Sequence, residues 1–139
     1  MNSRTAEREN FTAQLTRALP TMPPHVVAHY ARLLVRHSVT HGRLAEMSCN
    51  GHPLQSVCPP AGCDMPAWNA RVNKAQDRLD AYIEKREGQI ERRITAICAE
   101  LGLSPNFQGD PRGYTVKVAL PNGAYNTWGG REDGWGVPQ

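Results

Sequence analysis

Residues 64–102, DMPAWNARVNKAQDRLDAYIEKREGQIERRITAICAELG, decide the fold of this chain. Apolar residues recur there every three or four positions, which predicts one long helix that ends just before Gly102. Asp64 is a suitable N-cap, and Pro66 fits the first turn. Arg86 and Gly88 interrupt the pattern, which leaves a kink or local break there as an alternative to a continuous helix. The apolar stripe consists of Trp68, Val72, Ala75, Leu79, Tyr82, Ile90, Ile94, Ile97 and Leu101.

Two further helices are predicted ahead of this one. The first covers about residues 5–19, and the proline-rich segment 20–24 ends it. The second covers about residues 24–48, and Gly51 can end it in a left-handed conformation. A loop rich in proline and cysteine then spans residues 49–66. We therefore expect residues 1–103 to be a helical region that contains this loop.

Residues 104–139 differ sharply in composition and predict a small glycine-rich β region. Residues 114–120 alternate like a strand, and Asn122-Gly123 favours a hairpin turn into a return strand at 124–128. Phe107-Gln108 and residues 135–137 are candidate additional strands. The predicted class is α+β, with N-terminal helices followed by a small antiparallel sheet. Such a sheet needs support from the helices or from a second subunit, and the long helix favours a homo-oligomer.

Composition sets limits on the class of protein. The chain has 139 residues, of which 40% are hydrophobic and 21% charged, and this is typical of a globular domain. No run of about 18 apolar residues is present, so we expect no membrane span. The polar N-terminal residues predict no signal peptide, which suggests a cytoplasmic location.

The formal charge of +3 is carried mainly by arginine, with 13 Arg against 3 Lys. Arg17, Arg32, Arg36 and Arg43 lie in a segment with a local positive excess. An anion-binding surface is one interpretation, because Arg binds phosphate in a forked geometry. Compositional bias is the other. All five histidines also fall in this part of the chain, and the two i,i+4 pairs could bind a metal or respond to pH: His25 with His29, and His37 with His41.

The cysteines do not form a recognised metal motif. Cys49, His52, Cys58 and Cys63 could be assembled into a zinc site, but their spacing is not that of a zinc ribbon. Reduced thiols in a loop are the alternative, with Cys98 as a small core residue. No nucleophile elbow, Walker loop or paired-carboxylate motif is present. We therefore predict no cofactor and no enzymatic activity.

The C-terminal segment offers a candidate ligand site. Two glycines flank Asp-Pro-Arg in residues 109–113, where exposed N–H groups and an arginine fork could hold an anion. Aromatic and asparagine side chains downstream could stack on a base and read its edge. A plain glycine-rich turn, with tryptophans capping the sheet, is the alternative. The predicted ligand-binding residues are Phe107, Asp110, Arg112, Asn126, Trp128 and Arg131.

These motifs resemble a broad family of small phage and prophage proteins. The resemblance covers about two thirds of the chain, and residues 107–113, FQGDPRG, are its most specific part. Its other elements are Arg43-Leu44-Ala45-Glu46, Cys49-Asn50-Gly51, Cys98-Ala99-Glu100-Leu101-Gly102, Val116-Lys117-Val118, Pro121, Asn126, Trp128-Gly129 and Val137-Pro138. Relative to this pattern, Cys58 and Cys63 lie in an insertion.

Small phage proteins of this kind often counter host defence, and by analogy the resemblance implies a sponge of the anti-Thoeris or anti-CBASS type. Such a protein would sequester a small cyclic nucleotide signal in the host cytoplasm without cleaving it. Inhibition of a host defence complex, such as a CRISPR effector or a nuclease, is the alternative. A third hypothesis is nucleic-acid binding through Arg32, Arg36 and Arg43.

Overall fold

The computed structural model describes residues 3–107, 116–120 and 125–128. Within these ranges, helices form the first part of the chain and a small antiparallel sheet follows, which confirms the predicted α+β class. The elements are α1 (Ser3–Ala18), α2 (Pro24–Asn50), the short 3-10 helix η1 (Pro53–Ser56), α3 (Met65–Leu101), β1 (Ser104–Asn106), β2 (Val116–Ala119) and β3 (Tyr125–Trp128).

Helix α3 has 37 residues and is therefore about 55 Å long. At its start, the Asp64 carboxylate accepts a hydrogen bond from the Ala67 amide, as predicted. At its end, Gly102 adopts the left-handed conformation with a φ of 71°. The helix has no break at Gly88, because it continues through this residue to Leu101. A glycine costs a helix about 1 kcal/mol, and burial of Ile90 and Ile94 in the following turns offsets that cost.

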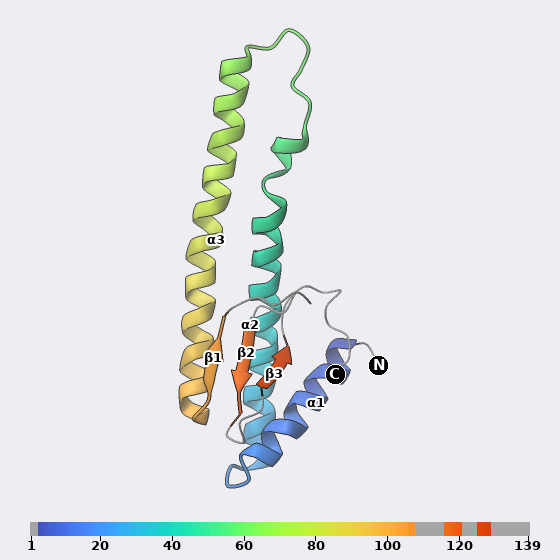
Figure 1. The fold of residues 1–139 in the computed structure, drawn as a ribbon, viewed down its shortest axis with the longest axis vertical. Coiled ribbons are helices and arrows are strands. Elements are labelled where there is room, and N and C mark those ends of the chain that lie inside the picture. The colour runs from blue at the N-terminus through green and yellow to red at the C-terminus, as the bar shows by residue number, and fades with distance from the viewer. Residues whose placement is uncertain (1–2, 108–115, 121–124, 129–139) are drawn as a thin grey trace.

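Helices α2 and α3 form an antiparallel hairpin, and α1 folds back against the lower part of α2 (Figure 1). The buried residues of α3 begin at Ile83 and end at Leu101. Residues 65–78 of α3 stand above the core, together with the end of α2 and the connection through η1, and Leu79 is the first residue of α3 that packs against the core. The lower half of the predicted apolar stripe of α3 therefore packs against α2 within the same chain.

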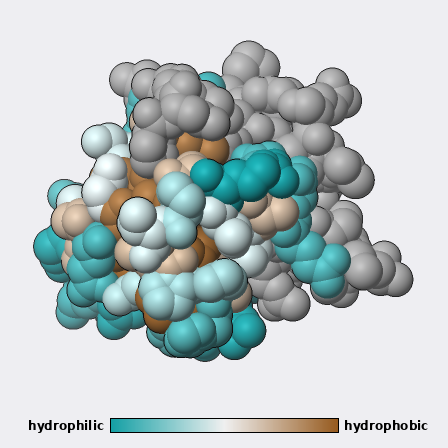
Figure 2. Space-filling model, turned by 90° about the horizontal axis from the view of Figure 1, so that it is seen from below, coloured by the Kyte–Doolittle hydropathy of each residue, from teal (hydrophilic) through white to brown (hydrophobic). Residues whose placement is uncertain are grey.

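The hydrophobic core lies in the lower half of the molecule. Most of its buried side chains come from α1, α2, α3 and β2, and β1 and β3 contact β2 on either side. Its largest fully buried side chains are Phe11, Leu15, Val27, Leu34, Ile90, Ile94, Val116 and Val118. The last two belong to β2, so the sheet is joined to the helices by a shared core. Seen from below, hydrophobic residues at this end are visible between hydrophilic ones (Figure 2).

The sheet has the order β1-β2-β3, and both pairs are antiparallel. One edge strand is Ser104–Asn106, which ends just before Phe107 of the expected Phe107-Gln108 strand, and Gln108 lies outside the described residues. The Leu103 amide bonds to the Cys98 carbonyl as α3 ends, and Ser104 at once pairs with Ala119. Within the described residues, the predicted strands at 114–120 and 124–128 correspond to β2 and β3, while residues 114, 115 and 124 lie outside that part of the chain. The Asn122-Gly123 turn and the strand expected at 135–137 lie outside the described residues.

Candidate functional site

The exposed side of α2 is basic along much of its length. Arg32, Arg36 and Arg43 are exposed and follow one another at intervals of four and seven residues, which places them on one side of the helix. No Asp or Glu occurs between Pro24 and Ala45, so no carboxylate of α2 neutralises this part of the stripe.

Helix α3 brings a second set of positive charges to the same side of the hairpin. His37 of α2 is partly buried, and burial is the main reason that its pKa lies below the ordinary value. The positive charges that lower this pKa further are those of Arg93, Arg36 and Arg86. Arg86 and Arg93 come from α3, so cations of two helices lie near one imidazole. We name Arg32, Arg36, His37, Arg86 and Arg93 the basic face.

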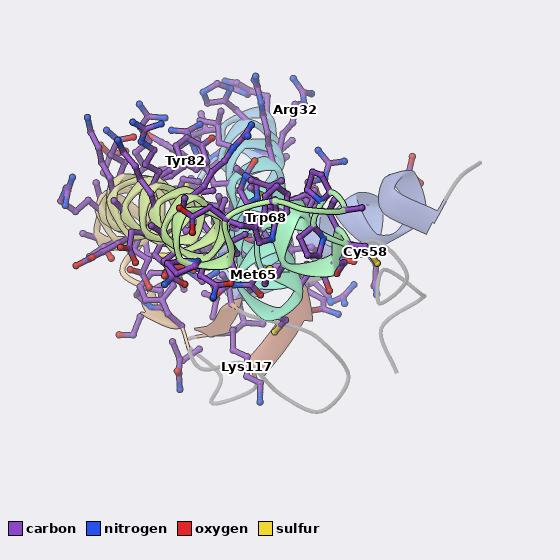
Figure 3. The ribbon with its side chains drawn as sticks, turned by 90° about the horizontal axis from the view of Figure 1, so that it is seen from above. Arg32, Cys58, Met65, Trp68, Tyr82 and Lys117 are labelled. Carbon is purple, nitrogen blue, oxygen red and sulfur yellow. The ribbon has the colours of Figure 1, made fainter. Side chains whose placement is uncertain are left out.

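An exposed aromatic residue lies beside the basic face. Tyr82 is 54% exposed and lines an open hollow of about 240 Å³ with Lys85, Arg86 and Gln89. The Arg86 guanidinium donates a hydrogen bond to the Gln89 amide oxygen over 3.3 Å. Seen from above, Tyr82 and Arg32 lie on the side of the helix pair opposite Lys117 of β2 (Figure 3). This side therefore combines forked cations with a flat ring.

Most negative charges of α3 lie on another side of the helix. Glu100 is the exception, because it follows Arg93 by seven residues, and its hydrogen bond and charge raise the pKa of Tyr30 in α2. Glu91 reaches His41 of α2, whose Nε2 lies 3.3 Å from the carboxylate Oε1. His41 is buried, and its ring centroid lies 5.6 Å from that of Phe107, near the sheet. Two buried polar atoms here, His41 Nδ1 and Ser38 Oγ, have no hydrogen-bond partner within the described part of the chain. The remaining acidic residues of the α3 segment 77–91 are Asp77, Asp80, Glu84 and Glu87.

The C-terminal ligand residues predicted from the sequence are placed only in part. Phe107 is half-buried and packs against the core beside His41. In the β2–β3 register, Asn126 pairs with Val118 and Trp128 pairs with Val116. Asp110, Arg112 and Arg131 lie outside the described residues. The grouping of these six residues therefore stays a prediction.

The weak zinc candidates are all described, and the structure does not bring them together. Among the described residues, no group of three or more His, Cys, Asp or Glu side chains could hold a metal ion. The His52 imidazole has a local structural role, because its Nδ1 accepts the Leu54 amide of η1 over 3.0 Å. The His52 amide in turn donates to the side chain of Gln76 in α3 over 2.8 Å. Cys49 and Cys58 are exposed, and Cys63 is half-buried.

No protein-family model, curated protein or solved structure matches this chain. The resemblance to phage proteins therefore stays a prediction. In the described part of the chain, none of the helices is apolar over enough of its length to cross a bilayer.

Sequence reasoning identified the α2 arginines but missed their partners on α3. Arg86 and Arg93 are seven residues apart, so they lie on one side of α3. The available signal was that spacing, combined with the position of the hydrophobic stripe. It could not show which side of α3 would face the same direction as Arg36.

Proposed function

We propose that this chain is a non-enzymatic nucleic-acid-binding protein whose basic face contacts the phosphates of a single strand. The observation that carries the proposal is the line of exposed arginines along one side of α2, formed by Arg32, Arg36 and Arg43. Arg86 and Arg93 of α3 add positive charge near it, since after burial their charges and that of Arg36 lower the pKa of His37. Arginine binds phosphate oxygens through a planar fork of N–H donors. A nearby phosphate would also favour protonation of the imidazole, which its present neighbours oppose.

The dimensions of the α2 stripe favour a polymer over a lone anion. Arg32 and Arg43 are 11 positions apart, which corresponds to about 16 Å along the helix. A strand would place several consecutive phosphates over that distance. The exposed ring of Tyr82 offers a surface on which an unpaired base can stack. Stacking on an open ring suits a single strand, in which the faces of the bases are accessible.

Sequestration of a cyclic nucleotide draws support from the same chemistry. The hollow beside Tyr82, Lys85, Arg86 and Gln89 combines a ring, two cations and an amide, which is the donor set of a mononucleotide site. The phage anti-defence role and the Gly-Asp-Pro-Arg-Gly site remain hypotheses beside it. If the protein instead inhibits a host defence complex, the basic face would bind carboxylates on an acidic surface of that complex.

Fluorescence anisotropy with a labelled 20-nucleotide DNA strand tests the proposal. We expect the Arg36→Ala/Arg93→Ala double variant to bind the strand about 10- to 100-fold more weakly, since each lost charged hydrogen bond costs about 0.7–1.4 kcal/mol at an exposed site. The matched control is Lys117→Thr, which removes a cation on the opposite side of the helix pair.

Three ligands distinguish the hypotheses in this assay: the single strand, its duplex and a labelled cyclic dinucleotide. Preferential binding of the single strand, lost in the double variant and kept in the control, supports the proposal. Binding of the cyclic dinucleotide alone would favour sequestration. Failure of all three ligands to bind at low salt would overturn the proposal and favour a protein partner.

A further inference from the structure

The outward side of α3 carries a charge pattern that repeats every seven residues. An acidic residue is followed directly by a basic one at three such positions: Asp77-Arg78, Glu84-Lys85 and Glu91-Arg92. Small residues repeat with the same seven-residue spacing at Ala81, Gly88 and Thr95. Ala81 lies three residues before Glu84, and Gly88 lies three residues before Glu91. The repeat therefore consists of a small residue flanked by an acid on one side and a cation on the other.

This face is open in the single chain. Ala81, Glu84, Lys85, Arg92 and Thr95 are exposed, and Gly88 is partly exposed. A Cβ added at Gly88 would meet only the end of the Arg92 side chain, at 3.3 Å. A shallow hollow of about 460 Å³ runs along the face and is lined by Gly88, Glu91, Arg92, Thr95, Ala96 and Ala99.

The centre of this face points away from both surfaces already described, and its margins adjoin them, because Lys85 also lines the hollow beside Tyr82 and Glu91 also reaches His41. The hydrophobic residues of α3 that face α2 include Ile83, Ile90 and Ile94, which are buried. A full turn of an α-helix takes 3.6 residues, so Gly88 points well away from Ile90 and from the basic-face residue Arg86. In Figure 1, the side of α3 away from α2 and the sheet is free along its length.

We propose that a second copy of this chain binds here, with its α3 parallel to the first and related to it by a two-fold axis along the helices. In that arrangement the acidic side of each helix faces the basic side of its partner, so that Glu84 meets Lys85 of the second copy at the same height. An antiparallel pair would instead set acid against acid and cation against cation. The charge pattern thus selects both the occupant and its direction.

The line of small residues is compatible with this pairing, because it lets two helix axes approach closely. A strict seven-residue repeat drifts on a straight helix, so the two helices should cross with a slight left-handed twist. The predicted homo-oligomer would then use the outward side of α3. The apolar stripe that first suggested it is used within the chain in its lower half.

Sedimentation equilibrium of the full chain tests the pairing, and charge variants identify the face. We expect a dimer whose association constant falls about tenfold or more in Lys85→Glu/Arg92→Glu, which places like charges across the interface. The matched control is Glu84→Lys/Lys85→Glu, which exchanges the two charges and preserves complementarity in a parallel pair. Circular dichroism checks that each variant stays helical.

Disulfide cross-linking determines the direction of the pair, in a background where Cys49, Cys58 and Cys63 are replaced by Ser. A parallel pair predicts that Ala81→Cys links to itself and that Thr95→Cys links to itself on mild oxidation. An antiparallel pair centred on Gly88 predicts links only when the two variants are mixed. That result, or a wild-type monomer at concentrations up to about 0.5 mM, would overturn the proposal.

Discussion

Replacing Ser38 by Ala should stabilise this protein. Ser38 lies in α2 with a fully buried side chain, and its Oγ has no hydrogen-bond partner within the described part of the chain. A buried polar group without a partner costs about 1–3 kcal/mol, and alanine is also the better helix former by a few tenths of a kcal/mol. The hydroxyl is small and leaves little empty volume when removed. We therefore expect the free energy of unfolding to rise by about 1–2 kcal/mol.

Urea unfolding followed by circular dichroism measures this change, and the melting temperature should rise by a few degrees. The matched control is Ser48→Ala, which makes the same replacement at an exposed position of the same helix. That control should show only the small propensity gain. A decrease in stability for Ser38→Ala would refute the reasoning, because it would mean that the hydroxyl makes a favourable bond in the folded protein.

Three further predictions concern the thiols, the connection between α2 and α3, and pH. A thiol reagent should react first with the exposed Cys49 and Cys58 and then with Cys63, whereas Cys98 should react only on unfolding, because burial raises its pKa to about 11; rapid reaction of all four thiols would contradict this. Gln76 Oε1 accepts hydrogen bonds from the His52 amide and from the Gln55 side chain. The Gln76→Leu variant should therefore lose about 1 kcal/mol of stability and exchange the His52 amide hydrogen faster. Unchanged exchange at His52 would show that these two hydrogen bonds do not hold the connection in place. Folding lowers the pKa of His37, so the unfolded chain takes up a proton at this residue before the folded protein does, and the protein loses stability as the pH falls below about 6.5. The wild-type protein should therefore lose more stability between pH 7 and pH 5 than the His37→Gln variant. Equal losses would show that His37 does not cause this pH dependence.

Much of the helical region could be predicted because its boundary signals are local. Asp64 and Gly102 cap α3 as expected from the residue types alone, and the prolines before α2 separate it from α1. The exception was Gly88. A glycine lowers helix propensity locally, but burial of nearby isoleucines depends on α2, and no local pattern reports the strength of that packing.

The sheet was predicted less well, because strand pairing depends on contacts distant in sequence. Residues 116–119 carry an alternating pattern and were recognisable. Ser104–Asn106 has no such pattern. It forms a strand because α3 ends at Leu101 near β2, which places the next residues where they can pair with β2. The candidate site was likewise predictable only where it depends on residues close together in the sequence. The spacing of Arg32, Arg36 and Arg43 was visible, whereas the approach of Arg86 and Arg93 to His37 required the geometry of two packed helices.

The salt dependence of single-strand binding tests the central claim most directly. Each phosphate contact with a single strand contributes about −0.7 to the slope of log K against log salt, so the four arginines of the basic face together with Arg43 predict a slope of about −3.5. Arg36→Ala/Arg93→Ala should reduce its magnitude by about 1.4, while Lys117→Thr leaves it unchanged. A slope near zero, or one that the double variant does not alter, would contradict the assignment of the basic face as the phosphate-binding surface.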